Sequence, residues 1–293
     1  MLTLSFFSFL LVMRKQVAYL GPKGTYAEKA AEILSDFANY ELPIFVPCKG
    51  LHSVIKSIAY KNCDAAVVPI ENSVEGGVTA TLDALWKFPN LKISQAIVLP
   101  IKHALISSGK LSDISEVLSH PQALAQCSDW LSENLPEAIL LPTNSTSEAV
   151  NMVKGSSFRA AIGSKALVAI EGLEELAFPI NDVSGNCTRF VLLSETKVSE
   201  AANIASFAFS LLDNQPGALL KALNTIANLG FNMSKIESRP SKRELGEYII
   251  YVDVAIDEIN DIKTFEILKE NLKPLCEHLN DFGCYLSKNI SLE

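Results

Sequence analysis

Apolar and polar positions alternate in blocks along the first two thirds of the chain. Short apolar runs are typical of buried strands, and the segments between them carry apolar residues at helical spacing. The strands are expected at 16–21, 44–48 and 63–71, and the helices at 25–34, 52–60 and 78–88. This alternation predicts a parallel sheet with helices on its faces. A long extended run at 91–101 is expected to cross to a second lobe.

The stretch from about residue 100 to 178 predicts that second α/β lobe. Ser145 and Glu148 have capping-box spacing, and Gly172 is a good residue to end a helix. Helices are expected around 113–119, over 121–131, from Ser145 and over 165–173, with strands at 138–142 and 159–164. Apolar segments at 176–180 and 188–193 would then return the chain to the first lobe.

The last part of the chain, residues 204–290, has a different order of elements. Phe207, Phe209 and Leu211 alternate with small residues, as in a half-buried strand. Strands are expected at 204–212, 233–240, 246–256 and, briefly, 284–288, with helices at 217–230 and 262–275. The order βαββαβ is that of a ferredoxin-like α+β unit. The polar segment 195–203 reads as a linker, so we expect one domain over 16–196 and another over 204–290.

Residues 1–15, MLTLSFFSFLLVMRK, do not fit either domain. The apolar run has the length of a signal-peptide core, but no positive charge precedes it and no small-residue cleavage site follows. It is also too short to span a membrane. We expect an extension outside the fold, with Met13 as a conventional cytosolic start. A weak membrane anchor or an uncleaved signal is the alternative.

Composition narrows the function. The chain has 293 residues and a net charge of −8, which argues against a nucleic-acid partner but leaves room for a small anionic ligand. The six cysteines form no CxxC pair and no cluster with histidine at metal-binding spacing, so we expect no metal site. Their scatter suits free thiols in a reducing cytoplasm.

Polar clusters stand at the strand-to-helix junctions of the first domain. They lie at 21–26, 69–81, 119–124 and 144–149, and a fifth, GNCTRF, lies at 185–190. Ligands of open α/β sheets bind at the carboxyl ends of strands, where helix N-termini favour anions. GPKGT is neither a dinucleotide fingerprint nor a P-loop, and its glycines could serve a tight turn alone. From the residues alone, we expect a two-lobed cytosolic α/β protein that binds a small anion.

A resemblance to a known family makes the expected function more specific. YLGPKGTYAE, PIENSVEGGVTATLDAL, SHPQALAQC, AAIGSKAL and GNCTRFVLL resemble, in order and spacing, the motifs of the prephenate dehydratase family. PGALLKAL and KIESRP resemble its phenylalanine-binding regulatory ACT domain. The resemblance runs from about residue 16 to near the C-terminus. It departs at Glu148, Val150 and Cys187, where other residue types are usual.

The resemblance implies a two-lobed catalytic domain like that of periplasmic binding proteins, followed by an ACT domain. It implies the monofunctional enzyme, which converts prephenate to phenylpyruvate in phenylalanine biosynthesis without cofactor or metal. Thr188 would hydrogen-bond the departing hydroxyl, and Asn186 would orient the loop or the substrate. Arg189 would pair with a substrate carboxylate, with a structural salt bridge as the alternative. Further substrate contacts are expected from Thr25, Asn72, Ser73, Thr81 and Phe190.

In the ACT domain the resemblance implies a site for phenylalanine as feedback inhibitor, formed between the copies of a homodimer or homotetramer. Its residues would be Asn214, Gly217, Ala218, Leu219, Glu237, Ser238, Arg239 and Pro240. Three alternatives stay open: an arogenate dehydratase, a solute-binding protein without catalysis, and a ligand sensor. The attached ferredoxin-like domain argues against a solute receptor, which would not need it.

Overall fold

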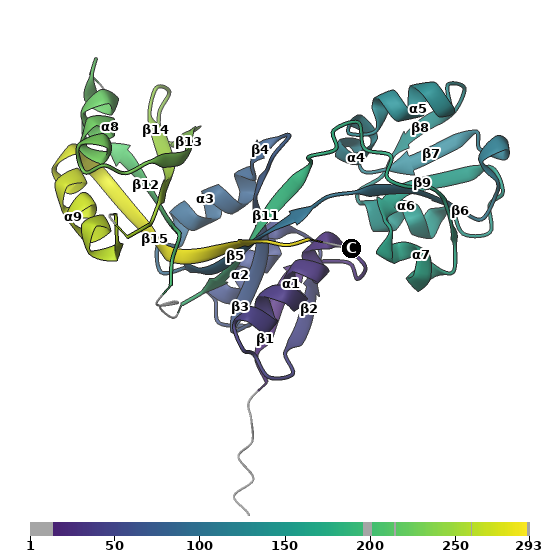
Figure 1. Ribbon diagram of the computed structural model, residues 1–293, viewed down its shortest axis with the longest axis horizontal. Helices are drawn as coiled ribbons and strands as arrows, with labels where there is room; N and C mark the ends of the chain where they lie inside the picture. Colours follow the sequence, from purple (N-terminus) through teal and green to yellow (C-terminus); the bar gives the residue numbers. More distant parts are fainter. Residues whose placement is uncertain (1–13, 196–200, 214, 259, 292–293) are drawn as a thin grey trace, which may run out of the picture.

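The computed structural model describes residues 14–195, 201–213, 215–258 and 260–291, and they form two lobes and a third, C-terminal domain (Figure 1). Within these ranges, no helix is both long and apolar enough to cross a membrane. The expectation about the start at Met13 concerns residues that lie outside the described part. Arg14 and Lys15, expected to belong to the extension, do contact the first lobe. Arg14 Nε donates to the carbonyl of Leu42 over 2.6 Å, and Lys15 pairs with Asp64 over 3.0 Å.

Lobe 1 is a twisted sheet with helices on both faces. Its elements are β1 (Gln16–Leu20), α1 (Tyr26–Phe37), β2 (Ile44–Cys48), α2 (Leu51–Ala59), β3 (Ala65–Asn72), β4 (Gly76–Gly77), α3 (Thr79–Lys87), β5 (Lys92–Pro100) and β11 (Cys187–Ser194). The strand order is β5-β11-β3-β1-β2. Strands β1, β2 and β3 are parallel, as expected, whereas β11 runs antiparallel to both β3 and β5.

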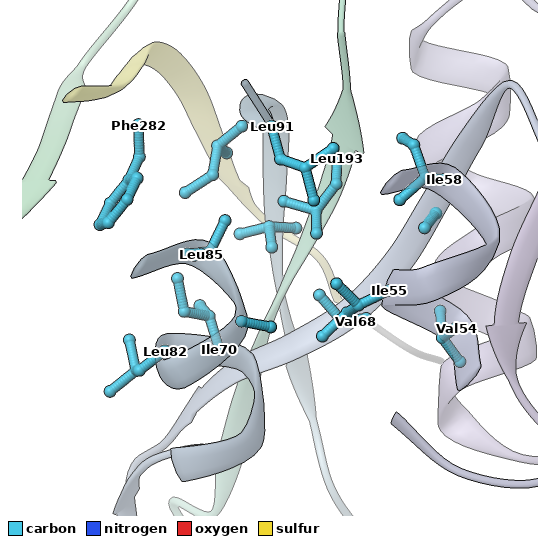
Figure 2. Packing of buried hydrophobic residues seen from close by; sticks show 14 of the residues in the cluster. Val54, Ile55, Ile58, Val68, Ile70, Leu82, Leu85, Leu91, Leu193 and Phe282 are labelled. Atoms are coloured by element: carbon cyan, nitrogen blue, oxygen red, sulfur yellow. The ribbon is translucent and has the colours of Figure 1, made fainter. Parts of the chain in front are cut away.

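Alternation along these strands divides the core of lobe 1 into two layers. Tyr19 and Phe190 face helix α1, together with the residues of the same parity on neighbouring strands. Val68 and Leu193 point to the other face, where α2 and α3 cover them. Figure 2 shows this second layer, in which Phe282 from the C-terminal domain lies close to Leu85 and Leu91.

Lobe 2 is a five-stranded mixed sheet with short helices. Its elements are β6 (His103–Ser107), β7 (Glu116–Ser119), α4 (Pro121–Ala125), α5 (Ser128–Asn134), β8 (Ile139–Pro142), α6 (Thr146–Met152), β9 (Arg159–Ser164), α7 (Ala166–Glu171) and β10 (Glu174–Ala177), in the order β10-β6-β9-β7-β8. The helix expected around 113–119 is wrong: a 3-10 turn (η1, Leu111–Asp113) is followed by strand β7. Ile114, Val117 and Leu118 are buried at helical spacing, but in a short run the same spacing fits a buried strand.

The C-terminal domain has the expected ferredoxin-like order. Its elements are β12 (Ile204–Leu211), α8 (Ala218–Asn228), β13 (Met233–Pro240), β14 (Tyr248–Ala255), α9 (Ile262–Leu272), a 3-10 turn (η2, Lys273–Leu275) and β15 (Cys276–Asn289). The strand order is β13-β14-β12-β15, so β13 is an edge strand. Helices α8 and α9 cover one face, where Phe265 of α9 packs with Phe207 and Phe209 of β12. The other face packs against α3 of lobe 1.

Strand β15 joins the C-terminal domain to lobe 1. It is 14 residues long, much longer than the short strand expected at 284–288. Its first part pairs with β12, and its end runs parallel to β5, with Leu286 opposite Gln95 and Asn289 opposite Val98. The two sheets therefore form one continuous sheet, and Figure 1 shows the yellow strand crossing from one domain to the other.

Candidate active site

A cavity of about 460 Å³ lies between the two lobes. Its lining comes from lobe 1, from the two segments that cross between the lobes, and from lobe 2. The lining residues are Leu20, Gly21, Thr25, Tyr26, Ala27, Lys49, Leu51, Pro69, Asn72, Val78, Ile101, His103, His120, Gln122, Ala123, Gln126, Asn144, Ser145, Thr146, Thr188 and Phe190. All five polar clusters of the sequence thus contribute to one site, as their positions at strand-to-helix junctions predict.

Asn72, at the end of β3, fixes the hydroxyl of Thr188. Its Oδ1 accepts hydrogen bonds from the backbone N–H groups of Val74 (3.0 Å) and Glu75 (3.1 Å), which orients the amide. Its Nδ2 therefore faces Thr188 and lies 3.0 Å from Oγ1. Asn72 and Thr188 are also partners across the β3–β11 ladder. Because Thr188 Oγ1 accepts this bond, its own proton is free, and no described residue accepts it. The hydroxyl can therefore donate to a ligand in the cavity.

A chain of side-chain amides connects Thr188 to lobe 2. The Nδ2 group of Asn72 also donates to Asn186 Oδ1 over 2.9 Å, and Asn186 Nδ2 donates to Gln126 Oε1 over 3.0 Å. Gln126, which follows α4 in lobe 2, returns a bond from Nε2 to Glu75 of lobe 1 over 3.1 Å. Each amide thus has one consistent orientation. Gln126 was not among the site residues predicted from sequence, although it lies inside the SHPQALAQC motif.

His103 completes this chain at the start of β6. Its Nε2 lies 3.0 Å from Gln126 Oε1, which is an acceptor, so Nε2 carries the proton. Burial lowers the pKa of His103, and the hydrogen bond to Gln126 opposes this only partly. The imidazole is therefore neutral near pH 7. The sequence contained no indication of this hydrogen bond, because the residues next to His103 in the chain would also fit an ordinary half-buried histidine.

The charge of the cavity comes from one side chain. Among the described residues that line it, Lys49 is the only lysine or arginine, and none is a carboxylate. Lys49 follows β2 and directly precedes Gly50, the N-cap of α2, so its ammonium and the helix end both favour an anion. Tyr26 lines the same cavity and clamps the crossing segment. Its hydroxyl donates to the carbonyl of Lys102 (2.6 Å) and accepts from the N–H of Lys102 (2.9 Å).

The other residues expected to contact substrate fall into two groups. Thr25, the N-cap of α1, and Phe190 both line the cavity. Ser73 does not: its hydroxyl donates to the carbonyl of Gly185 and accepts from the N–H of Cys187, where it ties the crossing loop to lobe 1. Thr81 is fully buried and donates to the carbonyl of Pro69 over 2.6 Å. The structure gives Ser73 and Thr81 supporting places behind the cavity.

Arg189 lies on the opposite face of β11 from Thr188. Successive side chains of a strand point to opposite faces, so Thr188 and Phe190 face the cavity while Arg189 faces the C-terminal domain. Its guanidinium contacts Glu71 and Asp253 and is absent from the lining of the cavity. Arg189 was expected to pair with a substrate carboxylate, but the structure places it away from the cavity, in ion pairs with Glu71 and Asp253. In the described cavity, Lys49 is the cation available for that role.

The residues expected to bind phenylalanine lie on α8 and β13. Gly217 is the N-cap of α8 and has a φ of 86°, and Ala218 and Leu219 form the first turn. On β13, Ser238 and Pro240 are exposed, whereas Glu237 and Arg239 point to lobe 1, where Arg239 lies 3.5 Å from Asp83. Asn214 lies outside the described residues.

Comparison with known proteins agrees with this architecture. A family model described as prephenate dehydratase matches residues 17–198, and one described as ACT domain matches residues 208–272. The prephenate dehydratase of Methanocaldococcus jannaschii is 38% identical over 278 residues, which are 93% of this chain and 98% of that protein. That of Lactococcus lactis subsp. lactis is 37% identical over 261 residues, 87% of this chain and 92% of that protein.

A solved structure gives the same result in three dimensions. The prephenate dehydratase of Arthrobacter aurescens, in complex with L-Phe, matches with a TM-score of 0.83 at 32% identity, over 92% of this chain and 90% of that one. The two-lobed domain and the ACT domain are therefore found together in a relative of clear sequence similarity. The chain belongs to the prephenate dehydratase family, with a C-terminal ACT domain.

Proposed function

We propose that the chain catalyses the decarboxylating dehydration of prephenate to phenylpyruvate and is inhibited by phenylalanine. The observation that carries the catalytic part is the free hydroxyl proton of Thr188, held toward an interlobe cavity by Asn72. Membership of the family supports the choice of substrate. The cavity, at about 460 Å³, has room for a ligand of this size.

The reaction needs stabilisation at one atom, the oxygen of the leaving ring hydroxyl. The bond from the ring to its carboxylate breaks and releases CO₂, its electron pair enters the ring, and the bond to the ring hydroxyl breaks. The leaving oxygen gains negative charge and takes up one proton to become water. Thr188 stabilises that oxygen by donating a hydrogen bond, and solvent supplies the proton, since an unassisted threonine is a poor acid. Aromatisation of the ring provides the driving force.

The rest of the cavity suits a dicarboxylate that must lose one carboxylate. Lys49 pairs with the pyruvyl carboxylate, which remains in the product. The ring carboxylate faces neutral polar residues of the lining, such as Gln122 and Thr146, because a full positive charge there would stabilise the substrate more than the transition state. The neutral His103 is consistent with this requirement.

The test is direct. The purified full-length protein is incubated with prephenate, and phenylpyruvate is followed by its absorbance, with arogenate and phenylalanine formation measured in parallel. Turnover of prephenate supports the proposal. Turnover of arogenate alone would make the chain an arogenate dehydratase. Binding of prephenate without turnover would favour a solute-binding protein or a sensor.

For the inhibition by phenylalanine, the support is the ACT domain and the L-Phe complex of the Arthrobacter aurescens relative. The N-terminus of α8, at Gly217, Ala218 and Leu219, offers backbone N–H groups to the carboxylate of an amino acid. We propose that the site is completed in a homodimer or homotetramer, because β13 is an edge strand with Ile236 half exposed. Calorimetric titration of phenylalanine, together with the mass of the protein in solution, tests both parts.

We also propose that the protein works in the cytoplasm. Cys48, Cys63, Cys127, Cys187 and Cys276 are free thiols in the structure. Such thiols are usual in a reducing compartment. Fractionation of cells that express the full-length chain tests this: the activity should appear in the cytosolic fraction, and activity that pellets with membranes would contradict it.

A further inference from the structure

Strand β11 connects the cavity to the ACT domain through two neighbouring residues. Thr188 lines the interlobe cavity, and Arg189 points to the other side of the sheet. There Arg189 borders a second cavity of about 380 Å³, between lobe 1 and the ACT domain, whose lining includes Cys187, Asn203 and Ser287. Whatever holds Arg189 in place also acts on the backbone that carries Thr188.

The ACT domain holds Arg189 with buried polar groups from three of its strands. Asp253 on β14 pairs with Nη2 of Arg189, and the hydroxyl of Tyr285 on β15 lies 3.5 Å from Nη1. Ser206 on β12 bridges these two partners: its Oγ donates to the second oxygen of Asp253 over 2.5 Å and lies 2.7 Å from the hydroxyl of Tyr285. Glu71 of lobe 1 accepts from Nη2 over 2.7 Å.

This arrangement is buried and specific. Arg189 is 8% exposed, Asp253 5%, Ser206 2% and Tyr285 not at all. Burial alone would lower the pKa of Arg189, but Tyr285, Asp253 and then Glu71 raise it above its usual value, so the guanidinium stays charged. A buried ion pair of this kind contributes little to stability compared with apolar packing, but it fixes geometry closely.

The backbone of β11 departs from a regular ladder with β3 at this point. Thr188 pairs with Asn72 and Arg189 with Glu71, but the register then shifts, so that Phe190 lies opposite Pro69. The ladder between β11 and β3 is therefore interrupted directly after Arg189. Pairing with β5 continues across this point, so a side chain fixed at position 189 restrains the strand on the side where its ladder is interrupted.

We propose that Asp253 of the ACT domain is a positioning residue for the dehydratase reaction: by holding Arg189 it fixes the segment of β11 that presents the Thr188 hydroxyl. This inference rests on the proposed function. It makes the ACT domain a part of the catalytic machinery even without phenylalanine. Misplacement of a catalytic group by about 1 Å can cost up to roughly 10²-fold in rate, so the effect is measurable.

The test is the variant Asp253→Asn in the full-length protein, with prephenate as substrate and no phenylalanine. We expect kcat to fall by about tenfold or more, with KM within threefold of wild type. The reason is that the displaced group, the Thr188 hydroxyl, acts in the transition state. Asp281→Asn is the matched control. Asp281 is also an ACT-domain carboxylate in an ion pair, with Lys269 over 2.6 Å, and this variant should keep wild-type kcat.

A second measurement separates positioning from a general loss of structure. Asp253→Asn is introduced into a protein that already carries Arg189→Met. If Asp253 acts through Arg189, the second change should cost less than twofold in kcat. An equal loss of kcat in both backgrounds would overturn the proposal. So would a folded Asp253→Asn protein with unchanged kcat, or one in which only KM rises.

If Asp253→Asn does not fold, Tyr285→Phe decides by the same criteria. It keeps the buried ring and removes only the hydroxyl that contacts Arg189 and Ser206. We expect kcat to fall two- to fivefold, and an unchanged kcat would overturn the proposal. Wild-type turnover is measured beside every variant. Its absence would refute the proposed function itself, whereas an active wild type with unaffected variants would refute only the role of Asp253.

Discussion

The amide nitrogen of Asn72 lies 3.0 Å from the hydroxyl oxygen of Thr188, and the two residues are 116 positions apart in the sequence. This bond decides which way the threonine hydroxyl points. Asn72 supplies the proton of the bond, so Thr188 keeps its own for a ligand in the cavity.

Asn72→Asp should reverse this arrangement. The carboxylate has the same shape but can only accept, so Thr188 would turn its proton toward residue 72 and away from the cavity. We expect kcat to fall by about 10²–10³, the usual cost of one transition-state donor. Steady-state kinetics with prephenate measures it. Asn151→Asp, on α6 away from the cavity lining, is the control, and a folded Asn72→Asp protein with kcat within threefold of wild type would contradict the assignment.

Lys49→Met should weaken substrate binding more than it slows the chemistry. In the proposed function the ammonium pairs with a carboxylate that stays in the product, so its loss would remove binding of substrate and transition state alike. We expect KM to rise about tenfold, with kcat within threefold. Lys56→Met, on α2 and outside the cavity lining, is the control. An unchanged KM in Lys49→Met would show that Lys49 does not bind the substrate.

The polar clusters expected to form the site line one cavity, whereas Arg189 lies on the other face of its strand. The clusters at 119–124 and 144–149 follow two neighbouring parallel strands of lobe 2, and the cluster at 21–26 follows a strand of lobe 1. They meet at one cavity because the carboxyl ends of these strands border the space between the lobes. Thr188 and Arg189 could not both face it, because neighbours on a strand point to opposite faces. The strand predicted at 188–193 already implied that Thr188 and Arg189 point to opposite faces. It did not show which of the two faces the cavity.

What sequence could not predict depends on how separate elements pack. Gln126 belongs to lobe 2, and its bonds to Asn186 and Glu75 exist only once the lobes are placed together. His103 reaches Gln126 only through the packing of lobe 2 itself. The length of strand β15 also depends on packing: residues 286–289 are a strand because they pair with the edge of β5. Local propensity carries no information about such a partner.

His103 should make the fold less stable in mild acid. Its pKa is lowered by burial, so between its ordinary value of about 6.5 and its lower folded value the unfolded chain binds more protons than the folded one. The stability from the neutral imidazole is thus complete above about pH 6.5 and is lost as the pH falls. The melting temperature of wild type should fall more between pH 7 and pH 5.5 than that of His103→Gln. His52→Gln, at an exposed position on α2, is the control. Equal slopes for wild type and His103→Gln would contradict this account.

Gly217→Ala should weaken phenylalanine binding. Gly217 has a φ of 86°, which alanine adopts only with strain, so the start of α8 would shift. We expect the Kd for phenylalanine to rise about tenfold by calorimetry. Gly230→Ala is the matched control, because Gly230 has a φ of 81° but lies at the other end of the same helix. Equal weakening in both variants would place the effector elsewhere.

The most direct test of the account is the rate at which full-length wild type, Thr188→Ser and Thr188→Ala convert prephenate to phenylpyruvate. Serine keeps the hydroxyl and should retain kcat within about tenfold, whereas alanine should lose about 10²–10³ in kcat with little change in KM. Circular dichroism and melting temperature check that the variants are folded. A folded Thr188→Ala protein that turns over prephenate within threefold of wild type would contradict the central claim that this hydroxyl assists departure of the leaving group.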